Sequence, residues 1–158
     1  RMGANIDITK KREKHGESYA TVKVRYTKVL VGRKFGGDSA PSHIEEVPFL
    51  AVCASFAQGE SIIRNLPENH PIINTTVSNL RLAGVDVGEI EDGLVIRGRL
   101  ECDAANFDAF NNPVLAWALY ALAITCHGNS TLANAQEVMF DLFPNTLESL
   151  RTEIEDEL

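Results

Sequence analysis

The sequence predicts a mixed α/β (α+β) fold in which a helix-and-sheet unit occurs about twice. One observation is the alternation of polar and apolar residues from Tyr19 to Tyr26, which is typical of a strand with one solvated face. A second is a pair of apolar runs of helical length, which begin at P-F-L-A (48–51) and at P-V-L-A (113–116). These tetrapeptides start 65 residues apart, and a motif that recurs in similar contexts indicates a repeated structural unit.

In the first half of the chain, turn residues and hydrophobic periodicity predict the order of elements. We expect strands at 6–11 and 19–26, a loop at 36–41, a helix from 42 or 43 to 57, and a strand at 60–66. Glu45 and Glu46 fall in the first turn of that helix, where the helix dipole stabilises negative charge. Gly59 is expected to end the helix.

The second half of the chain repeats this alternation of helices and strands. We expect a helix at 72–83, hairpin strands at 85–90 and 94–99, a further strand at 100–102, an apolar helix from 113 to 127, a strand at 130–133, and a final helix with an apolar face at Leu147, Leu150 and Ile154. Glu91-Asp92-Gly93 is a strong turn signal for the hairpin. Asn112 before Pro113 fits an N-cap followed by proline at the first helical position.

Composition indicates one globular domain, residues 1–158, with 44% apolar and 23% charged residues. The net charge of −7 and the pI near 5.1 argue against nucleic acid as a partner, because a duplex-binding protein needs a basic face. Basic residues do cluster near the start of the chain, and their alternation with apolar residues indicates a solvated strand face: Lys10, Lys11, Arg12, Lys14, Lys23, Arg25, Lys28, Arg33 and Lys34.

The cysteines and histidines do not have the spacing of metal ligands. Cys53, Cys102 and Cys126 are far apart, so we expect reduced, buried thiols, no metal site and no cofactor in a cytoplasmic protein. The longest apolar run, residues 114–126, is too short to span a bilayer, so we expect no membrane association.

The order of several motifs resembles the last part of the 5-enolpyruvylshikimate-3-phosphate (EPSP) synthase family. These motifs are R-M-G-A-N-I at the start, A-P-S-H-I-E-E-V-P-F-L-A-V-C-A-S-F-A-Q-G-E-S, N-L-R-L-A-G-V-D-V, E-D-G-L-V-I-R-G and a late F-P. The resemblance implies an inside-out α/β barrel type of lobe, with helices inside and sheets outside. It also implies about two repeats, residues 42–102 and 107–158, of a lobe that has three in the family.

The resemblance further implies kinship with transfer of the enolpyruvyl group of phosphoenolpyruvate to shikimate 3-phosphate in aromatic amino-acid biosynthesis. The family has a proposed acid/base Asp where this sequence has Glu45. A general acid or base must come within about 2.6–3.2 Å of the reacting atom, so the extra methylene matters. Glu45 is therefore either a catalytic carboxylate or only the charged start of a core helix.

Other positions that bind anions in the family have lost their cations. The family's Arg-x-Lys-Glu-Ser-Asp-Arg loop should follow Arg64, but a shorter P-E-N-H-P-I-I stands there, which leaves Arg64 and His70 as the substrate-binding candidates. The family's Asp-His-Arg falls on Asn112-Pro113-Val114, so an aliphatic side chain replaces a guanidinium that can bind carboxylate or phosphate in a bidentate way. Near Phe143-Pro144, where the family often has Lys or a small hydroxyl residue, the sequence has Asp141-Leu142.

Three functional hypotheses follow from these departures. The chain is an EPSP-synthase-like domain that is inactive alone, or one piece of an enolpyruvyl transferase completed by another segment or chain, or a module that binds a protein or small ligand. Phosphoenolpyruvate and shikimate 3-phosphate are expected ligands only for the completed enzyme. A partial lobe leaves apolar surface open, so we also expect a homo-oligomer or a partner chain.

Overall fold

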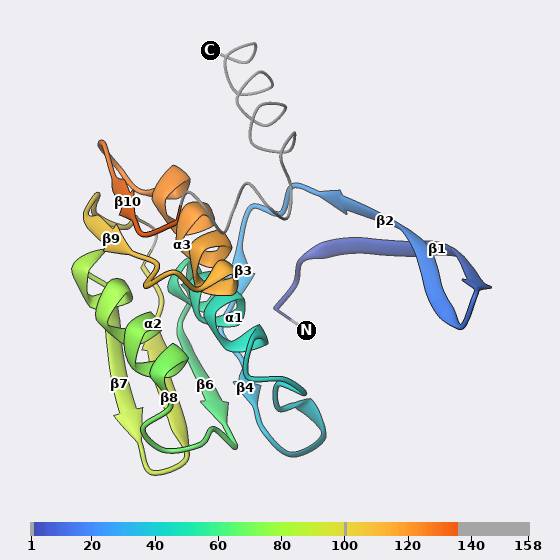
Figure 1. Ribbon diagram of the computed structural model, residues 1–158, viewed down its shortest axis with the longest axis horizontal. Coiled ribbons are helices and arrows are strands. Elements are labelled where there is room, and N and C mark those ends of the chain that lie inside the picture. Colours follow the sequence, from blue (N-terminus) through green and yellow to red (C-terminus); the bar gives the residue numbers. More distant parts are fainter. Residues whose placement is uncertain (1, 100, 136–158) are drawn as a thin grey trace.

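Helices α1 and α2 lie against a four-stranded sheet, α3 packs on both of them, and a hairpin extends away from this body (Figure 1). The computed structural model describes residues 2–99 and 101–135. The helices are α1 (Glu46–Ser55), α2 (Pro71–Leu82), α3 (Pro113–Thr125) and the short 3-10 helix η1 (Gly37–Ser39). The strands are β1 (Asn5–Lys14), β2 (Glu17–Arg25), β3 (Leu30–Val31), β4 (Lys34–Phe35), β5 (Ala57–Gln58), β6 (Glu60–Arg64), β7 (Asp86–Ile90), β8 (Gly93–Arg97), β9 (Asn106–Asp108) and β10 (Thr131–Ala133).

The four-stranded sheet has the order β4-β6-β8-β7. β4 is parallel to β6, whereas β8 is antiparallel to both of its neighbours. Alternate side chains point toward the helices and are buried, as strand geometry requires, among them Ile63, Leu94 and Ile96. On β8, Arg97 is exposed and pairs with Glu60 and Asp86 of the neighbouring strands, so the opposite face of the sheet is solvated.

The three helices differ in how much of their surface is apolar. α2 is amphipathic: Ile73, Val77 and Leu80 are buried, at the spacing of one helical face. α1 and α3 are apolar on most sides, and this pattern is typical of helices enclosed by other elements. Two short strand pairs, β3 with β5 and β9 with β10, are parallel. Along the chain, α1 lies between the members of the first pair and α3 between those of the second.

Most predicted elements are confirmed, but the helix expected from 42 or 43 to 57 is shorter. It begins at Glu46, whose carboxylate accepts a hydrogen bond from the backbone N–H of Ser42. It ends at Ser55, because Ala57–Gln58 form β5 and pair with Leu30–Val31. Gly59 therefore lies between β5 and β6 and does not end the helix, as had been expected.

Two other expectations are wrong. Glu101 and Cys102 are not in a strand; instead, Asp103 forms an isolated parallel bridge with His127. Cys53 is exposed on α1, while Cys126 is half-buried and only Cys102 is fully buried, although all three thiols are free.

The final helix expected around Leu147, Leu150 and Ile154, and the Phe143-Pro144 motif, lie outside the described residues. None of the described helices has the length and hydropathy needed to cross a membrane.

One buried amide helps to connect the two halves of the described structure, together with the packing of α3 on α1 and α2. Asn79, on α2, is 2% exposed. Its Nδ2 donates to the carbonyl oxygens of Thr75 (2.8 Å) and Asp108 (3.0 Å). Its Oδ1 accepts from the N–H of Asp108 at 2.9 Å. α2 therefore holds β9 through both backbone groups of one residue.

We predict that Asn79→Ala lowers the free energy of unfolding by about 2–3 kcal/mol, because it leaves buried polar groups of Asp108 without their partners. Asn74→Ala, at an exposed position of the same helix, is the matched control and should change stability by about 0.5 kcal/mol or less. Urea unfolding followed by circular dichroism measures both. Equal midpoints for the two variants would show that this amide does not connect the halves.

Candidate functional site

The family resemblance implies that three sequence motifs form a site. These motifs lie at the starts of α1, α2 and α3, and the three helices pack against one another. Glu45 is the N-cap residue of α1, is exposed and makes no capping hydrogen bond with its side chain. His70 is the N-cap of α2, and its Nδ1 accepts a hydrogen bond from the N–H of Ile72 at 3.3 Å. Asn112 is the N-cap of α3, and its Oδ1 accepts from the N–H of Leu115 at 3.0 Å.

Arg64 lies at the end of β6 and pairs with a carboxylate. Its Nη1 donates to Oδ1 of Asp92 at 2.6 Å, and both side chains are about half exposed, 51% and 45%. Asp92 sits in the turn of the β7–β8 hairpin, so the pair links the end of β6 to that turn. The E-D-G turn signal was visible in the sequence, but it did not indicate that Asp92 would pair with Arg64.

The structure does not join the three predicted site residues to one another. In the described residues, no hydrogen bond or ion pair connects Glu45, Arg64 and His70. The loops before α1 and α2 do touch, because the N–H of Gly37 donates to Oδ1 of Asn65 at 3.3 Å. Sequence reasoning missed Asn65, which holds these two loops together.

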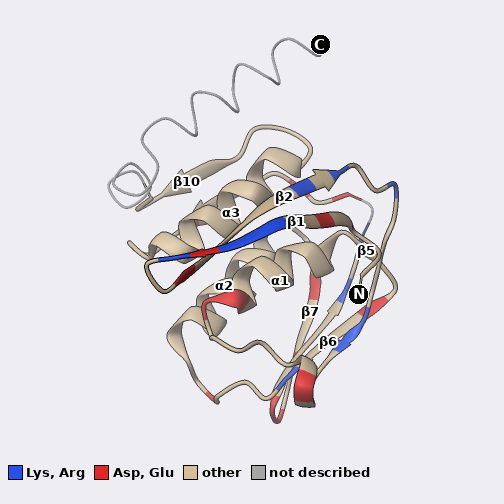
Figure 2. Ribbon diagram, turned by 90° about the vertical axis from the view of Figure 1, so that its right-hand side faces the viewer, with Lys and Arg blue, Asp and Glu red and all other residues tan. Residues whose placement is uncertain are grey.

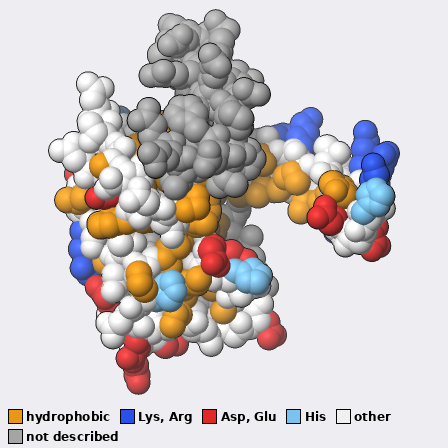
Figure 3. Space-filling model, viewed as in Figure 1, with side chains coloured by type: hydrophobic (Ala, Val, Ile, Leu, Met, Phe, Trp, Pro, Cys, Tyr) orange, Lys and Arg blue, Asp and Glu red, His pale blue; other side chains and the backbone are white. Residues whose placement is uncertain are grey.

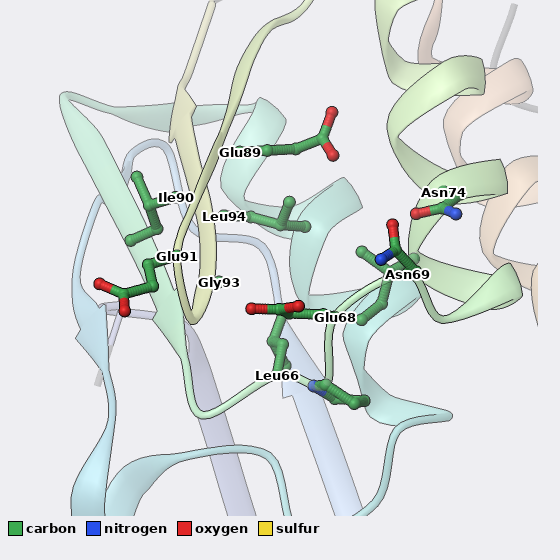
Figure 4. Close-up of a pocket in the computed structure, with 11 residues that line it drawn as sticks. Leu66, Glu68, Asn69, Asn74, Glu89, Ile90, Glu91, Gly93 and Leu94 are labelled. Atoms are coloured by element: carbon green, nitrogen blue, oxygen red, sulfur yellow. The ribbon is translucent and has the colours of Figure 1, made fainter.

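An open pocket of about 380 Å³ lies beside the loop that replaces the family's cationic motif. It is formed by the β6–α2 loop, the first turn of α2 and the β7–β8 hairpin. Figure 4 shows Glu68 and Glu89 between the hairpin and the start of α2. Glu91 also lines the pocket, whereas none of the described Lys and Arg residues does. Glu89 pairs with Arg81 (Nη2 to Oε1, 3.1 Å), while Glu68 and Glu91 present like charge to a phosphate or carboxylate in this pocket.

Lys and Arg are unevenly distributed over the molecule. On the face shown in Figure 3, blue side chains gather on the β1–β2 hairpin and at the left-hand edge of the body. Acidic and histidine side chains lie over the rest of the body among apolar ones. No group of His, Cys, Asp and Glu in the described ranges is placed to hold a metal ion.

The thiols are the groups with resolved pKa shifts nearest to the core. Burial raises the pKa of the Cys102 thiol to about 11, with a further contribution from the neighbouring Cys126. Desolvation also raises the pKa of Cys53 and of Cys126. Near neutral pH these side chains are therefore protonated thiols, which are poor nucleophiles.

Comparison with known proteins gives consistent matches over nearly the whole chain. The chain is 33% identical over 155 residues to a 3-phosphoshikimate 1-carboxyvinyltransferase of Synechococcus sp. and 35% identical over 158 residues to one of Desulforudis audaxviator. These matches cover 94% and 96% of this chain, but only 35% and 37% of the relatives. The chain thus spans about a third of the length of the curated relatives it matches. No protein-family model matches it.

Solved structures show the same fold. An EPSP synthase from Acinetobacter baumannii superposes with a TM-score of 0.85 at 22% identity, covering 96% of this chain and 36% of that chain. An enolpyruvyl transferase from Streptomyces tendae gives a TM-score of 0.68 at 22% identity, over 96% of this chain and 33% of that one. The predicted mixed α/β fold of the EPSP synthase type is therefore confirmed.

We predict that His70→Ala lowers stability by about 0.5–1 kcal/mol, because it removes the side-chain cap of α2. His70→Asn should retain stability, since its amide oxygen can accept the same hydrogen bond. Urea unfolding measures both variants. A His70→Ala protein as stable as the parent would mean that the cap contributes nothing, and a ligand role for the imidazole would gain support.

The thiols give a separate prediction. At pH 8, a chromogenic disulfide reagent should label exposed Cys53 first and leave Cys102 unlabelled, because Cys102 is buried and its pKa of about 11 keeps it protonated. Cys53→Ser should abolish the fast phase, and denaturant should expose the remaining thiols. A fast phase that persists in Cys53→Ser would contradict this assignment.

Proposed function

Because the chain belongs to the EPSP synthase family and corresponds to its C-terminal part, we propose that it is a lobe without catalytic activity on its own. In this proposal the chain alone neither binds phosphoenolpyruvate and shikimate 3-phosphate productively nor transfers the enolpyruvyl group. The proposal is supported chiefly by the loss of cations around the helix starts: the loop before α2 has no Lys or Arg after Arg64, and Val114 stands where the family resemblance places an Arg.

The individual contacts support this proposal. Arg64 forms an ion pair with Asp92. His70 uses its Nδ1 lone pair to cap α2 and so faces the helix backbone. Val114 has no polar atom on its side chain, although the family resemblance places a guanidinium there. The pocket beside the shortened loop is lined by Glu68, Glu89 and Glu91.

The magnitudes favour a loss of binding by several orders of magnitude. Removing one partner of a buried charged pair costs about 2–5 kcal/mol. About 1.4 kcal/mol corresponds to a tenfold change in affinity. The loss of two or three cations therefore weakens the binding of an anion greatly. Glu45 keeps a carboxylate at the position of the family's acid/base group, but a general acid needs a bound substrate within reach.

The second candidate function is a piece of an enzyme that another segment or chain completes. The observation that favours it is the length of the relatives, of which this chain covers 35% in the Synechococcus sp. case. In such an assembly Glu45 would be the acid/base group, and Arg64 and His70 would contact substrate. The missing cations would then come from the other polypeptide.

Calorimetric titration tests the proposal. We expect no heat of binding at millimolar phosphoenolpyruvate, with or without shikimate 3-phosphate, and the same result for Arg64→Gln. Micromolar binding by the parent chain that is lost in Arg64→Gln would contradict the proposal and assign Arg64 to a working site. Micromolar binding that survives in Arg64→Gln would also contradict it and direct attention to His70.

A further inference from the structure

Cys102 and Cys126 lie on two segments that pair in parallel at one position. The N–H of His127 donates to the carbonyl oxygen of Cys102 at 3.0 Å, and the N–H of Ala104 donates to the carbonyl oxygen of His127 at 3.1 Å. This pattern is a parallel bridge between Asp103 and His127. The backbone of Cys126 is extended (φ −75°, ψ 150°), so Cys102 and Cys126 lie across from each other, one residue before the bridge.

The two thiols share the buried side of these paired segments. Side chains alternate along extended chains, so Asp103 and His127 point one way and the two cysteines point the other. The side chains of Asp103 and His127 are 71% and 73% exposed. Cys102 belongs to the main hydrophobic core and is 1% exposed, and the half-buried Cys126 packs against the same core. Both sulfur atoms therefore enter the core from neighbouring backbone positions.

This placement meets the geometric requirements of a disulfide. Paired extended segments lie about 4.8 Å apart. A disulfide needs Cα atoms about 4.4–6.8 Å apart and side chains that point toward the same space. The electrostatics agree with this proximity. Burial raises the pKa of the Cys102 thiol to about 11, and the neighbouring Cys126 is the next contributor to that shift.

The surroundings of the two thiols make them slow to react and make a bond between them slow to break. Cys126 ends α3, and the helix dipole disfavours a thiolate at that end. α3 carries no charged residue and is tan in Figure 2. Burial is the main cause of the raised pKa of both thiols; Asp103 adds to it, whereas Arg99 opposes it at Cys102. Because thiols with a raised pKa are poor leaving groups, a disulfide between them resists reduction.

We propose that Cys102 and Cys126 are a redox-active pair, a modification site that small-molecule disulfides such as oxidised glutathione convert to an intramolecular disulfide. The bond closes a loop of the 25 residues from Cys102 to Cys126. This loop contains β9 and α3, so the bond ties the end of α3 to the segment before β9. The proposal goes beyond the proposed function and does not depend on whether phosphoenolpyruvate binds.

The chemistry proceeds in two thiol–disulfide exchange steps. Cys126 reacts first, because it is the less buried of the two. Its thiolate attacks one sulfur of oxidised glutathione, the disulfide breaks, and one glutathione thiolate leaves and takes up the proton that Cys126 released. The thiolate of Cys102 then attacks Sγ of Cys126 in the mixed disulfide, and the second glutathione leaves with the proton from Cys102. Two protein thiols are thus oxidised while one glutathione disulfide is reduced to two thiols.

Oxidation of the Cys53→Ser chain tests the proposal, because this variant lacks the exposed thiol that could link two molecules. The folded variant is held with oxidised glutathione at about pH 9, where more of each thiol is ionised. We expect both thiols to be lost, the mass to fall by two hydrogen atoms, and peptide mapping without reduction to find Cys102 joined to Cys126. The equilibrium constant for unfolding in urea should fall by about a hundredfold, because a closed loop of this length restricts the unfolded chain.

Matched variants in the Cys53→Ser background separate the two steps. Cys102→Ala should keep glutathione on Cys126 as a mixed disulfide, because no second thiol displaces it. Cys126→Ala should stay unmodified, because Cys102 is buried. Circular dichroism reports whether each variant is folded, and the Cys53→Ser chain alone decides if one is not.

Four results would overturn the proposal. In the Cys53→Ser chain these are two thiols that stay free while the protein is folded, glutathione that remains on Cys126 although Cys102 is present, a disulfide that joins two chains, and an unfolding constant that does not fall on oxidation.

Discussion

The buried amide of Asn79 fixes β9 against α2 and, together with the packing of α3 on α1, positions the second helix-and-strand unit on the first. This amide pairs with both backbone groups of Asp108, so the position of β9 is fixed relative to a helix of the preceding unit. β9 in turn pairs with β10, and α3 runs between them. Buried polar groups that are fully paired favour one arrangement over others, because any shift leaves them without partners. α2, which begins at the candidate residue His70, is thereby held against the strand that leads into α3.

Local patterns predicted the elements whose stabilisation is also local. The alternation from Tyr19, the E-D-G turn and the Asn112-Pro113 start identify β2, the β7–β8 hairpin and α3 from a few neighbouring residues. The errors concern segments whose structure depends on distant partners. Ala57–Gln58 continue an apolar helical pattern but form a strand, because Leu30–Val31 offer a parallel edge. Cys53 lies within an apolar run yet is exposed, because α1 is not covered on that side within the described residues.

At the candidate site, too, the sequence indicated local features but not the contacts between distant residues. Sequence reasoning placed Glu45 inside the first turn of a helix and His70 in the connection before the next one, whereas both are N-cap residues. It did not find that Asp92 pairs with Arg64, or that Asn65 joins two loops, since these contacts cross 28 residues of sequence. The resemblance to EPSP synthases supplied the expected roles, while the geometry shows how the remaining polar groups are used. The helix caps and the Arg64–Asp92 ion pair stabilise the fold, and carboxylates line the pocket beside them.

The lobe has the family's fold, and we propose that its catalytic centre is not assembled in this chain alone. The most direct measurement is phosphate release from phosphoenolpyruvate in the presence of shikimate 3-phosphate, since enolpyruvyl transfer frees one phosphate per turnover. We expect the purified chain to release phosphate at the rate of the blank, and Glu45→Gln to leave that rate unchanged. Phosphate release that depends on shikimate 3-phosphate and falls in Glu45→Gln would contradict the proposal and would identify a working enzyme.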